Sequence, residues 1–501
     1  MGVQVPVQVR QVHAVELNVG TVFDESGVVR DAGGVKRYLD LPASLVDLLR
    51  SAADRAPDRA AVVELDGPRA TYRQLWDSCA RVAGGLRDTG IRPGDRVAIR
   101  YGNGLDWVRA FFGTLMAGAV AVPVNTRLVD REVEHIVRDS DAAAVLHGAL
   151  PDGAPHVVDA RDPAAIFYTS GTTGYPKGAV LTHENFLTNA ENGLRVSGLP
   201  RADPDLRNLV SVPLFHVAAC NSQLIPTMQV AGTTVVMPAF DVDRFLRAIV
   251  EERIRVVSSA PAIFWRALHH PEFHRYDVSG VGWATYGGAP VAPALVRRIK
   301  QGFPEALVGN GFGLTETSSL STYLPDRYAY THADSVGFAA PTVDVALAEP
   351  GVVSELLIRG GNVVGGYWRN PAATAAAFRD GWLRTGDLAR IDDAGRVYLV
   401  DRLTDMINRG GENVYCVEVE NVLAGAPGVF EVAVLGVPDE VLGESVAAVV
   451  VPVPGQPFDE AAVLDHARER LARYKVPQHV RVRREPLPRN AGGKVRKDLL
   501  R

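Results

Sequence analysis

A glycine- and hydroxyl-rich stretch from Phe167 to Gly178 constrains this chain more than any other segment. It follows the apolar run Ala164–Phe167 and ends in a proline, a lysine and a glycine. Glycines let backbone N–H groups turn toward an anion, and hydroxyls and an ammonium group add donors and charge. We therefore expect a phosphate-binding loop. It is not a Walker A loop, because glycine follows Lys177 where serine or threonine is required. A structural turn between two strands is the simpler alternative.

Length, composition and charge limit the class of protein. The chain has 501 residues, which is too many for one core, so we expect at least two domains. A hydrophobic content of 47% and a charged content of 22% are ordinary for a soluble enzyme, and the net charge of −5 argues against a nucleic-acid partner. We see no stretch that predicts a membrane span or a signal peptide. Cys79, Cys220 and Cys416 lie far apart, so we expect a cytoplasmic location.

Strand and helix patterns alternate from residue 41 onward. This alternation predicts an α/β fold of stacked layers with helices on the sheet faces. Short strands over 354–359 and 397–400 predict a small β-barrel-like region, and strands over 429–437, 446–453 and 480–483 around a helix predict a small mobile α+β C-terminal domain. We expect helices over 44–55, 72–88, 107–118, 132–140, 183–193, 241–253, 262–270, 294–301, 417–423 and 460–473.

Residues 1–41 are expected to form an extension ahead of the first domain. The segment from Val3 to Val15 is rich in β-formers, and Gly33-Gly34 marks a break. An edge strand and a contact in a homodimer are the two roles we consider for it.

The glycine-rich stretch resembles the signature loop of the adenylate-forming superfamily. That group contains acyl-CoA synthetases, aryl-CoA ligases, luciferases and the adenylation domains of peptide synthetases. The resemblance covers residues 42–501. It implies that the ATP phosphates are bound by the following loop residues: Thr169, Ser170, Gly171, Thr172, Thr173, Gly174 and Lys177.

A Pro-Leu-Phe-His turn at residues 213–216 resembles the next motif of the superfamily. There the last side chain stands between the acyl pocket and the thiol tunnel, which implies a catalytic or gating role for His216 and an acyl-pocket position for Val217. A hydrogen-bonded structural histidine is the alternative. Superfamily members that activate amino acids usually carry an aspartate at this position, so the histidine argues against an amino-acid substrate.

A strand that runs into a glycine turn, Trp283 to Pro290, resembles a segment that lines both the acyl pocket and the adenine site. The resemblance places Tyr286, Gly287 and Gly288 at the acyl pocket, and Gly288, Ala289 and Pro290 at the nucleotide. Glycines let a substrate approach the backbone closely. Together with Gly311 and Gly313 they indicate a roomy pocket, and the neighbouring small and aliphatic residues indicate an apolar one: Val217, Ala218, Ala219 and Leu320.

The segment Gly309–Glu316 resembles the Gly-Tyr-Gly-x-Thr-Glu motif. The resemblance implies that Phe312 stacks on adenine, that Thr315 contacts the α-phosphate, and that Glu316 holds Mg²⁺, a cation that prefers carboxylate and phosphate oxygens. Phe312 replaces the usual tyrosine and lacks its hydrogen bond. A glycine-rich strand end with a solvated glutamate is the alternative. The same motif places Asn310 and Gly311 at the nucleotide and Gly313 at the acyl pocket.

An Arg-Thr-Gly-Asp motif ends at Asp387, and an Asp-Arg pair follows at 401–402. In the superfamily this aspartate accepts both ribose hydroxyls, a natural role for a carboxylate, and Arg402 would reach the ribose. A surface-turn aspartate is the alternative. Thr404 stands at the hinge position, where aspartate or lysine is usual, and hinge motion needs only a few backbone rotations. We therefore expect an AMP-binding domain over 42–401 and a mobile C-terminal domain over 402–501.

The C-terminal motifs imply two alternating roles for the small domain. Gly410 and Gly411 match the segment that forms the pantetheine tunnel, and Lys475 is expected at the CoA site; Cys416 stands where proline is usual. Lys494 matches the catalytic lysine that inserts between the substrate carboxylate and the α-phosphate, a task suited to a single mobile ammonium. A basic tail that binds nothing is the alternative.

Together the motifs predict an acyl-CoA ligase that uses ATP, Mg²⁺ and coenzyme A. It would form acyl-AMP from a medium- or long-chain, or bulky hydrophobic, carboxylic acid and then transfer the acyl group to CoA. An aryl acid is an alternative substrate, and the pantetheine of a carrier protein is an alternative acceptor. The alternatives from other classes are a binding protein or partial enzyme that has lost one half-reaction, and a luciferase-type oxygenase.

Overall fold

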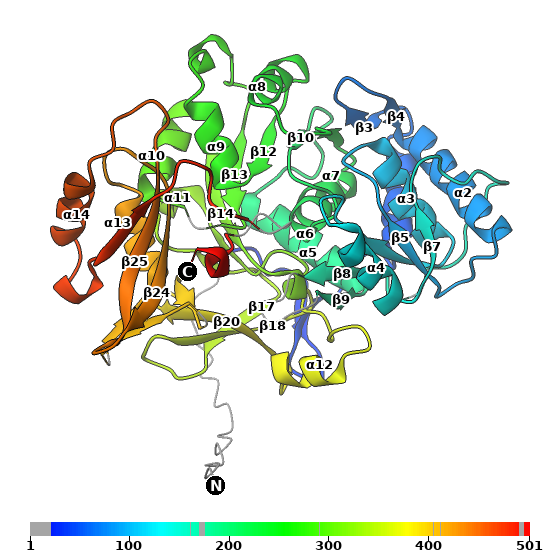
Figure 1. Ribbon diagram of the computed structural model, residues 1–501. Helices are drawn as coiled ribbons and strands as arrows, with labels where there is room; N and C mark the ends of the chain where they lie inside the picture. Colours follow the sequence, from blue (N-terminus) through cyan, green and yellow to red (C-terminus); the bar gives the residue numbers. More distant parts are fainter. Residues whose placement is uncertain are drawn as a thin grey trace, which may run out of the picture.

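The computed structural model describes residues 22–160, 162–169, 176–289, 291–403, 405–410, 412–489 and 495–500. Figure 1 shows a large body, coloured from blue to yellow, with the orange and red C-terminal strands packed on one side of it. The expected α/β class is confirmed. Within the described parts of the chain, no helix is both long and apolar enough to cross a membrane.

A nine-stranded sheet forms the centre of the large domain. Its central strands, β3 to β14, run parallel, and antiparallel strands are added at both edges. Parallel neighbours need crossover connections, which the alternating helices supply. The strands in spatial order are β16 (Phe338–Ala339), β15 (Thr322–Leu324), β14 (Leu307–Phe312), β13 (Trp283–Gly287), β12 (Val256–Ser259), β10 (Arg207–Val210), β11 (Thr233–Val236), β3 (Ala60–Glu64) and β4 (Arg69–Thr71).

A second, five-stranded sheet carries the signature hairpin. Its strands are parallel except for the last, which pairs antiparallel with its neighbour. In spatial order they are β7 (Ala142–Leu146), β5 (Arg96–Ile99), β6 (Val120–Pro123), β8 (Ala165–Thr169) and β9 (Lys177–Leu181).

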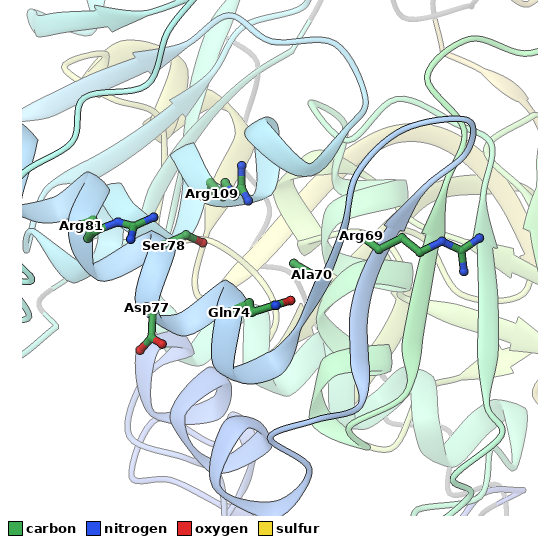
Figure 2. Close-up of a pocket in the computed structure, with 7 residues that line it drawn as sticks. All are labelled: Arg69, Ala70, Gln74, Asp77, Ser78, Arg81 and Arg109. Carbon is green, nitrogen blue, oxygen red and sulfur yellow. The ribbon is translucent and has the colours of Figure 1, made fainter.

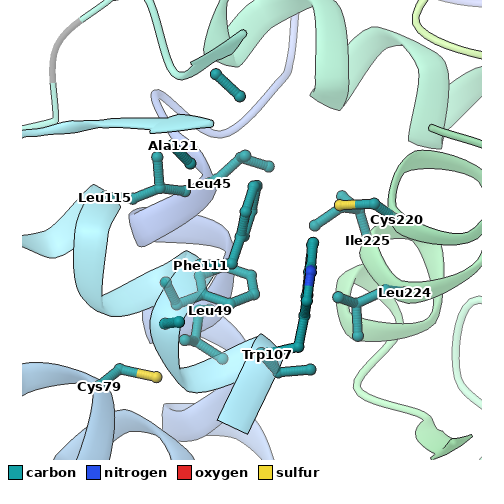
Figure 3. Close-up of a cluster of buried hydrophobic side chains, with 14 of the residues drawn as sticks. Leu45, Leu49, Cys79, Trp107, Phe111, Leu115, Ala121, Cys220, Leu224 and Ile225 are labelled. Carbon is teal, nitrogen blue, oxygen red and sulfur yellow. The ribbon is translucent and has the colours of Figure 1, made fainter. Parts of the chain in front are cut away.

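The largest core cluster joins helices of the first half of the chain to these sheets. Figure 3 shows its centre, where Trp107 and Phe111 stack with ring centroids 5.2 Å apart. Leu45 and Leu49 of one helix and Leu224 and Ile225 of a later segment close around them. The helices are α1 (Leu45–Arg55), α2 (Tyr72–Asp88), α3 (Leu105–Met116), α4 (Asp130–Asp139), α5 (His183–Ser197), α6 (Val217–Ala219), a π-helix (Cys220–Leu224) and α7 (Ile225–Gln229).

Helix α5 differs from the sequence expectation at its C-terminal end. Thr182 caps its start as expected, but the helix does not stop at Gly193. It continues to Ser197 because Leu194 and Val196 are buried, and it ends at Gly198, whose φ of 66° is left-handed. Packing of the last turn outweighs the modest cost of an interior glycine.

A second core cluster lies between the nine-stranded sheet and the helices of the middle region. These are α8 (Val242–Glu251), α9 (Pro261–Leu268), α10 (Pro293–Gly302) and α11 (Asp326–Ala329). The expected helices at 241–253, 262–270 and 294–301 are thus present with shifts of one to two residues at their ends.

The β-rich region over residues 343–402 forms a separate antiparallel sheet. Its strands are β17 (Val343–Leu347), β18 (Ser354–Gly360), β20 (Trp382–Ile391) and β19 (Phe378–Arg379), with β21 (Val397–Arg402) paired to β20 and α12 (Pro371–Ala377) beside it. The expected small β region is therefore present.

The described part of the N-terminal segment packs on the large domain. Strands β1 (Val28–Arg30) and β2 (Lys36–Tyr38) form their own two-stranded sheet, with the Gly33-Gly34 break at its turn. Tyr38 is buried and donates to Asn192 Oδ1 on α5 at 2.8 Å. Strand β1 is therefore not an edge strand of a larger sheet. The β-rich stretch Val3–Val15 lies outside the described residues.

The C-terminal domain is an α+β unit built on one mixed sheet. The expected helix over 460–473 is shorter than predicted and ends at Arg468, after which the chain turns so that Leu471 still joins the domain core. The elements are β22 (Ile407–Arg409), β23 (Glu412–Val414), α13 (Cys416–Leu423), β24 (Val429–Asp439), β25 (Gly443–Pro452), α14 (Glu460–Arg468) and β26 (His479–Val482).

Candidate active site

Strands β8 and β9 form the hairpin that carries the signature loop. Thr169 pairs with Lys177, so the two described ends of the loop lie opposite each other. His135 on α4 contacts this hairpin, with Nε2 lying 3.4 Å from the carbonyl oxygen of Pro176. The predicted phosphate ligands between these ends lie outside the described residues: Ser170, Gly171, Thr172, Thr173 and Gly174.

Lys177 and Glu316 both contact one tyrosine, Tyr367. The Lys177 Nζ atom lies 5.5 Å from the centroid of the Tyr367 ring. The Tyr367 hydroxyl donates a hydrogen bond to Glu316 Oε1 at 2.7 Å. The structure therefore brings a candidate phosphate ligand and the candidate metal ligand into one cluster.

The carboxyl ends of β13 and β14 bring the two glycine segments together. Tyr286 pairs with Asn310, and Gly287 pairs with Gly311, in a parallel register. Ligands of open α/β sheets bind outside such carboxyl ends. Asn310 is buried and donates to the carbonyl of Ser335 at 3.2 Å. Ala289 is exposed beyond β13, and Phe312 ends β14 half-buried, while Pro290 lies outside the described residues.

The glycines of these strands do not by themselves make the pocket roomy, which corrects the sequence interpretation. A Cβ atom on Gly287 would lie 2.3 Å from the carbonyl oxygen of Gly311, and one on Gly313 would lie 1.5 Å from that of Ser319. Neighbouring backbone fills both spaces. Gly288 differs, because nothing lies within 4 Å of its missing Cβ. Only Gly288 leaves open space for a ligand.

A strained turn follows Glu316. Ser318 and Ser319 adopt φ values of 56° and 114°, which side chains other than glycine seldom adopt. Asn362 holds the turn by donating to the carbonyls of Thr317 and Leu320 at 2.9 and 2.7 Å. Such strain persists where surrounding contacts over-determine it, and it is common at functional sites.

Asp387 and Arg402, the two residues predicted to bind the ribose, form an ion pair. They stand opposite each other on β20 and β21, with Arg402 Nε 2.6 Å from Asp387 Oδ1, and Asp387 is buried. Asp401, which directly precedes Arg402, accepts hydrogen bonds from the backbone N–H groups of Arg402 and Cys416. Burial raises the pKa of Asp401 to about 6, although these two N–H groups act in the opposite direction.

His216 precedes the short helix α6 and is half-buried. Its ring packs against the Phe215 ring, with centroids 4.8 Å apart. Its backbone N–H donates to the carbonyl of Pro213 at 3.1 Å. Val217 and Ala219 are buried whereas Ala218 is exposed. The expected roles of His216 and Val217 at the acyl pocket stay predictions.

The C-terminal site residues are held within their own domain. Gly410 donates through its N–H to the carbonyl of Leu442 at 2.8 Å. Lys475 makes an ion pair with Glu418 at 2.7 Å, so its ammonium is already neutralised by a neighbour, and its expected CoA role stays a prediction. Three further predicted residues, Thr404 at the hinge, Gly411 and Lys494, lie outside the described residues.

The segments on both sides of Lys494 are anchored on the C-terminal sheet. Arg489 forms an isolated bridge with Val495 and an ion pair with Glu431 at 2.8 Å. Lys497 pairs with the Glu420 carboxylate at 2.8 Å. The tail also lies within electrostatic reach of α4, because the pKa of Arg496 is raised first by Asp498 and then, more weakly, by Glu132.

Among the described residues, an aromatic pair and a backbone hydrogen bond are two of the contacts between the domains. Phe430 of β24 packs edge-to-face on Trp265 of α9, with ring centroids 4.6 Å apart. Phe430 belongs to the sheet face on which the C-terminal tail packs. The second contact is the Cys416 N–H bond to Asp401, and the Cys416 thiol also donates to the carbonyl of Asp405 at 3.0 Å. A proline at 416 would lack that N–H.

The residues present fit the expected divalent cation. The Tyr367 hydroxyl donates a hydrogen bond to Glu316 Oε1. None of the described residues donates one to the second carboxylate oxygen. No group of three or more potential metal-ligating side chains occurs among these residues either. One carboxylate with the remaining ligands supplied by nucleotide phosphates and water is how Mg²⁺ is usually held.

A cavity of about 340 Å³ lies elsewhere, between α2, α3 and β4 (Figure 2). Three arginines line it, but each already has an acidic partner: Arg69 with Glu252, Arg81 with Asp152 and Arg109 with Asp106. It contains none of the motif residues, so we do not assign it to the nucleotide or the acid.

Comparisons with known proteins agree with this geometry. The profile of the AMP-binding enzyme family matches residues 49–154 and 147–368, and that of the AMP-binding enzyme C-terminal domain matches 418–494. A feruloyl-CoA synthase of Amycolatopsis sp is 38% identical over 480 residues, covering 89% of this chain and 96% of that protein. The long-chain-fatty-acid–CoA ligase FadD13 of Mycobacterium tuberculosis is 38% identical over 497 residues, covering 91% and 97%.

A solved structure shows the same arrangement. The o-succinylbenzoate coenzyme A synthetase of Bacillus subtilis, in complex with ATP and magnesium ion, matches with a TM-score of 0.81 at 28% identity, covering 89% of this chain and 98% of that one. The fold and site thus define an adenylate-forming enzyme. The chain belongs to the AMP-binding enzyme family, and the membership expected from its signature loop is confirmed.

Sequence reasoning left three contacts unassigned. Tyr367 follows Gly365-Gly366, a pair that signals a close backbone approach but does not reveal the hydroxyl's partner. Asp401 directly precedes the motif residue Arg402, but its bond to Cys416 depends on how the domains meet. The contact between Trp265 and Phe430 has no sequence signal that we can identify.

Proposed function

We propose that this enzyme is an AMP-forming acid–thiol ligase. It activates a hydrophobic carboxylic acid with ATP, forms acyl-AMP with release of pyrophosphate, and transfers the acyl group to coenzyme A with release of AMP. The observation that carries this proposal is the meeting of Lys177 and Glu316 at Tyr367. The relatives named feruloyl-CoA synthase and long-chain-fatty-acid–CoA ligase support it.

In the first half-reaction, the carboxylate must approach a polyanion that repels it. We propose that Lys177 and Lys494 supply positive charge that offsets this repulsion. The signature-loop donors and Thr315 would add hydrogen bonds to the phosphates. Mg²⁺ held by Glu316 would neutralise phosphate charge at the same place. Asp387, paired with Arg402, would accept the ribose hydroxyls, while Phe312 and the backbone at Gly288 would face the adenine. These groups stabilise charge that develops at the α-phosphorus.

In the second half-reaction, the C-terminal domain turns about Thr404. Withdrawal of Lys494 would let the Gly410-Gly411 segment line the path of the pantetheine arm. The thiol then attacks the acyl carbon, and AMP leaves as the carbon–oxygen bond breaks. Contacts such as those of Phe430 and Cys416 with the large domain would be exchanged during such a rotation.

The acid is proposed to be hydrophobic because residues predicted at the acyl pocket, Val217, Leu320 and Tyr286, have apolar or aromatic side chains that are buried. Both relatives, one named for a long-chain acid and one for an aryl acid, agree with a hydrophobic substrate. Coenzyme A is the preferred acceptor, and the pantetheine of a carrier protein is the alternative.

The partner and compartment assignments are also proposals. A cytoplasmic location is supported by the three cysteines, which are all free thiols. We retain a homodimer as a hypothesis, to be examined by the mass of the protein in solution.

The function is tested with one panel of fatty, aryl and amino acids and two assays. ATP–pyrophosphate exchange reports adenylation, and thioester formation from presynthesised acyl-AMP and CoA reports the second step. We expect both activities with hydrophobic acids and neither with amino acids. Thioester formation without exchange across the whole panel would contradict the two-step proposal and leave a thioesterification enzyme.

A further inference from the structure

The segment Val364–Trp368 connects the two candidate charge-bearing motifs. At one end, the Val364 N–H donates to the backbone carbonyl of Glu316 at 2.9 Å. At the other, the Trp368 N–H donates to the carbonyl of Gly178 at 2.7 Å, directly after Lys177. Tyr367 forms a β-bridge with Ala179 between these anchors. The segment is therefore fixed to both motifs through its backbone.

The Tyr367 side chain repeats this connection. Its hydroxyl donates to Glu316 Oε1 at 2.7 Å, and its ring lies 5.5 Å from Lys177 Nζ, within the range of a cation–π contact. Its own backbone N–H is held by the Thr374 hydroxyl at 3.0 Å, and Phe378 packs on the ring edge at 5.9 Å. These contacts hold the hydroxyl, the ring and the backbone of Tyr367.

The phenol is a donor and not an acceptor toward the carboxylate. An ionised carboxylate can only accept, so the phenol O–H is the donor of this 2.7 Å bond. The bond to Oε1 restricts the rotation of the Glu316 side chain.

We propose that Tyr367 is a positioning residue for adenylation, which holds Glu316 with its second oxygen directed to the cation and keeps the Lys177 ammonium beside it. The proposal rests on the proposed function and adds a residue to it. A neighbour that orients a metal ligand typically contributes roughly 10- to 100-fold to metal affinity. The Tyr367 hydroxyl is therefore expected to contribute to the cooperation between Mg²⁺ and ATP, with a smaller effect on ATP binding without the cation.

The test compares wild type with Tyr367→Phe, which removes only the hydroxyl. Calorimetric titration with ATP, with and without Mg²⁺, gives the factor by which the cation strengthens nucleotide binding. We expect this factor to fall roughly 10-fold in Tyr367→Phe, while ATP binding without Mg²⁺ changes less than twofold. Thioester formation from acyl-AMP, which involves no polyphosphate, should keep the wild-type rate.

Tyr398→Phe is the matched control. Tyr398 likewise donates to a carboxylate, Asp392, at 3.2 Å, but neither of these two residues belongs to the motifs. We expect its Mg²⁺ factor to equal that of wild type. The proposal is overturned if Tyr367→Phe keeps the wild-type factor, or if its two half-reactions fall equally.

A double-mutant cycle with Glu316→Gln keeps the test valid if Tyr367→Phe also loses stability. If the hydroxyl acts through the carboxylate, Tyr367→Phe should change the Mg²⁺ factor no further in the Glu316→Gln background. An unchanged effect in that background would overturn the proposal. Failure of the proposed function is distinguishable, because wild type would then show no pyrophosphate exchange although ATP binding is still measurable.

Discussion

The nucleotide side of the large domain and the C-terminal domain hold their charged groups in different ways. On the large domain, side chains from separate elements contact one another at the site, as Tyr367 does with Glu316 and Lys177. In the C-terminal domain, the cation Lys475 pairs with Glu418 of the same domain. In the large domain a tyrosine stands between the cation and the carboxylate, whereas in the C-terminal domain the cation pairs directly with the carboxylate.

This difference suits the two parts to different tasks. A site that binds a polyanion needs its groups fixed in advance, because reorganisation during the reaction costs rate. A domain that changes its docking must instead be able to release its contacts with the other domain. Because Lys475 and Lys497 are already paired within the domain, it can leave one contact surface for another without leaving these charges alone, which would cost several kcal/mol for a buried charge.

The largest effect is expected for Lys494→Ala. We expect ATP–pyrophosphate exchange to fall roughly 10²- to 10³-fold, because a charge that stabilises the transition state is lost. Thioester formation from acyl-AMP should change less than about threefold, since the lysine is withdrawn in that step. Arg484→Ala, which removes an exposed cation ten residues earlier in the chain, is the control. Equal losses in both half-reactions of Lys494→Ala would contradict the division of labour between the domains.

Asp387→Asn is expected to affect both half-reactions. The ribose is present in ATP and in acyl-AMP, so losing a charged acceptor should lower kcat/KM of each step roughly 10- to 100-fold. Steady-state kinetics of the two assays provide the measurement. Asp392→Asn removes a comparable carboxylate, paired with Arg396 at 2.8 Å on the same hairpin, and should leave both steps unchanged. A selective loss of one step would argue against a ribose role.

The titration of Asp401 should make the domain contact pH-dependent. Since the folded pKa of Asp401, about 6, exceeds the usual 3.8, the folded state binds the proton more tightly. The stability that this group contributes is therefore complete below pH 4 and is lost as the pH rises through 6. Asp401→Asn does not titrate. Its unfolding free energy relative to wild type should rise by about 2 kcal/mol between pH 4 and pH 7.

Urea unfolding of both proteins at intervals across this pH range measures that difference. All other titrating groups are shared, so they cancel in the comparison. A difference that stays flat with pH would show that Asp401 is not buried against Cys416 in the way described.

The smallest effect is expected for Phe430→Ala. The edge-to-face contact with Trp265 should favour one docking of the C-terminal domain by about 0.5–1.5 kcal/mol, so exchange should fall roughly two- to tenfold. Thioester formation should not fall. Trp265→Ala should have the same effect, and the double variant no additional one. Val437→Ala, which trims the same sheet face away from Trp265, is the control. A larger loss in thioester formation than in exchange would contradict the assignment.

The sequence predicted the fold class and most elements because hydrophobic periodicity reports which faces are buried. Helix α2, for example, begins and ends where its amphipathic pattern does. The end of α5 was predicted wrongly at Gly193, since the burial of Leu194 and Val196 depends on distant segments. Periodicity contains no information about such partners.

For the candidate site, motifs placed Asp387 beside Arg402 and Glu316 near the signature hairpin, and the structure brings both sets together. The hydrogen bond of the Tyr367 hydroxyl was not predicted, because its partner Glu316 is 51 residues away in sequence. Its importance depends on two strands from different sheets ending near one another, which no local pattern encodes.

The glycines of the strand ends constrain how the substrate range of this enzyme can change in evolution. At Gly313 a side chain would collide with the backbone of Ser319, so this position should stay glycine in descendants of any specificity. At Gly309 the obstacle is the Tyr323 hydroxyl, only 1.8 Å from the missing Cβ, so a larger residue there requires simultaneous loss of that ring. New acids are therefore expected to be accommodated by replacing side chains such as Val217, while the glycine positions are inherited unchanged.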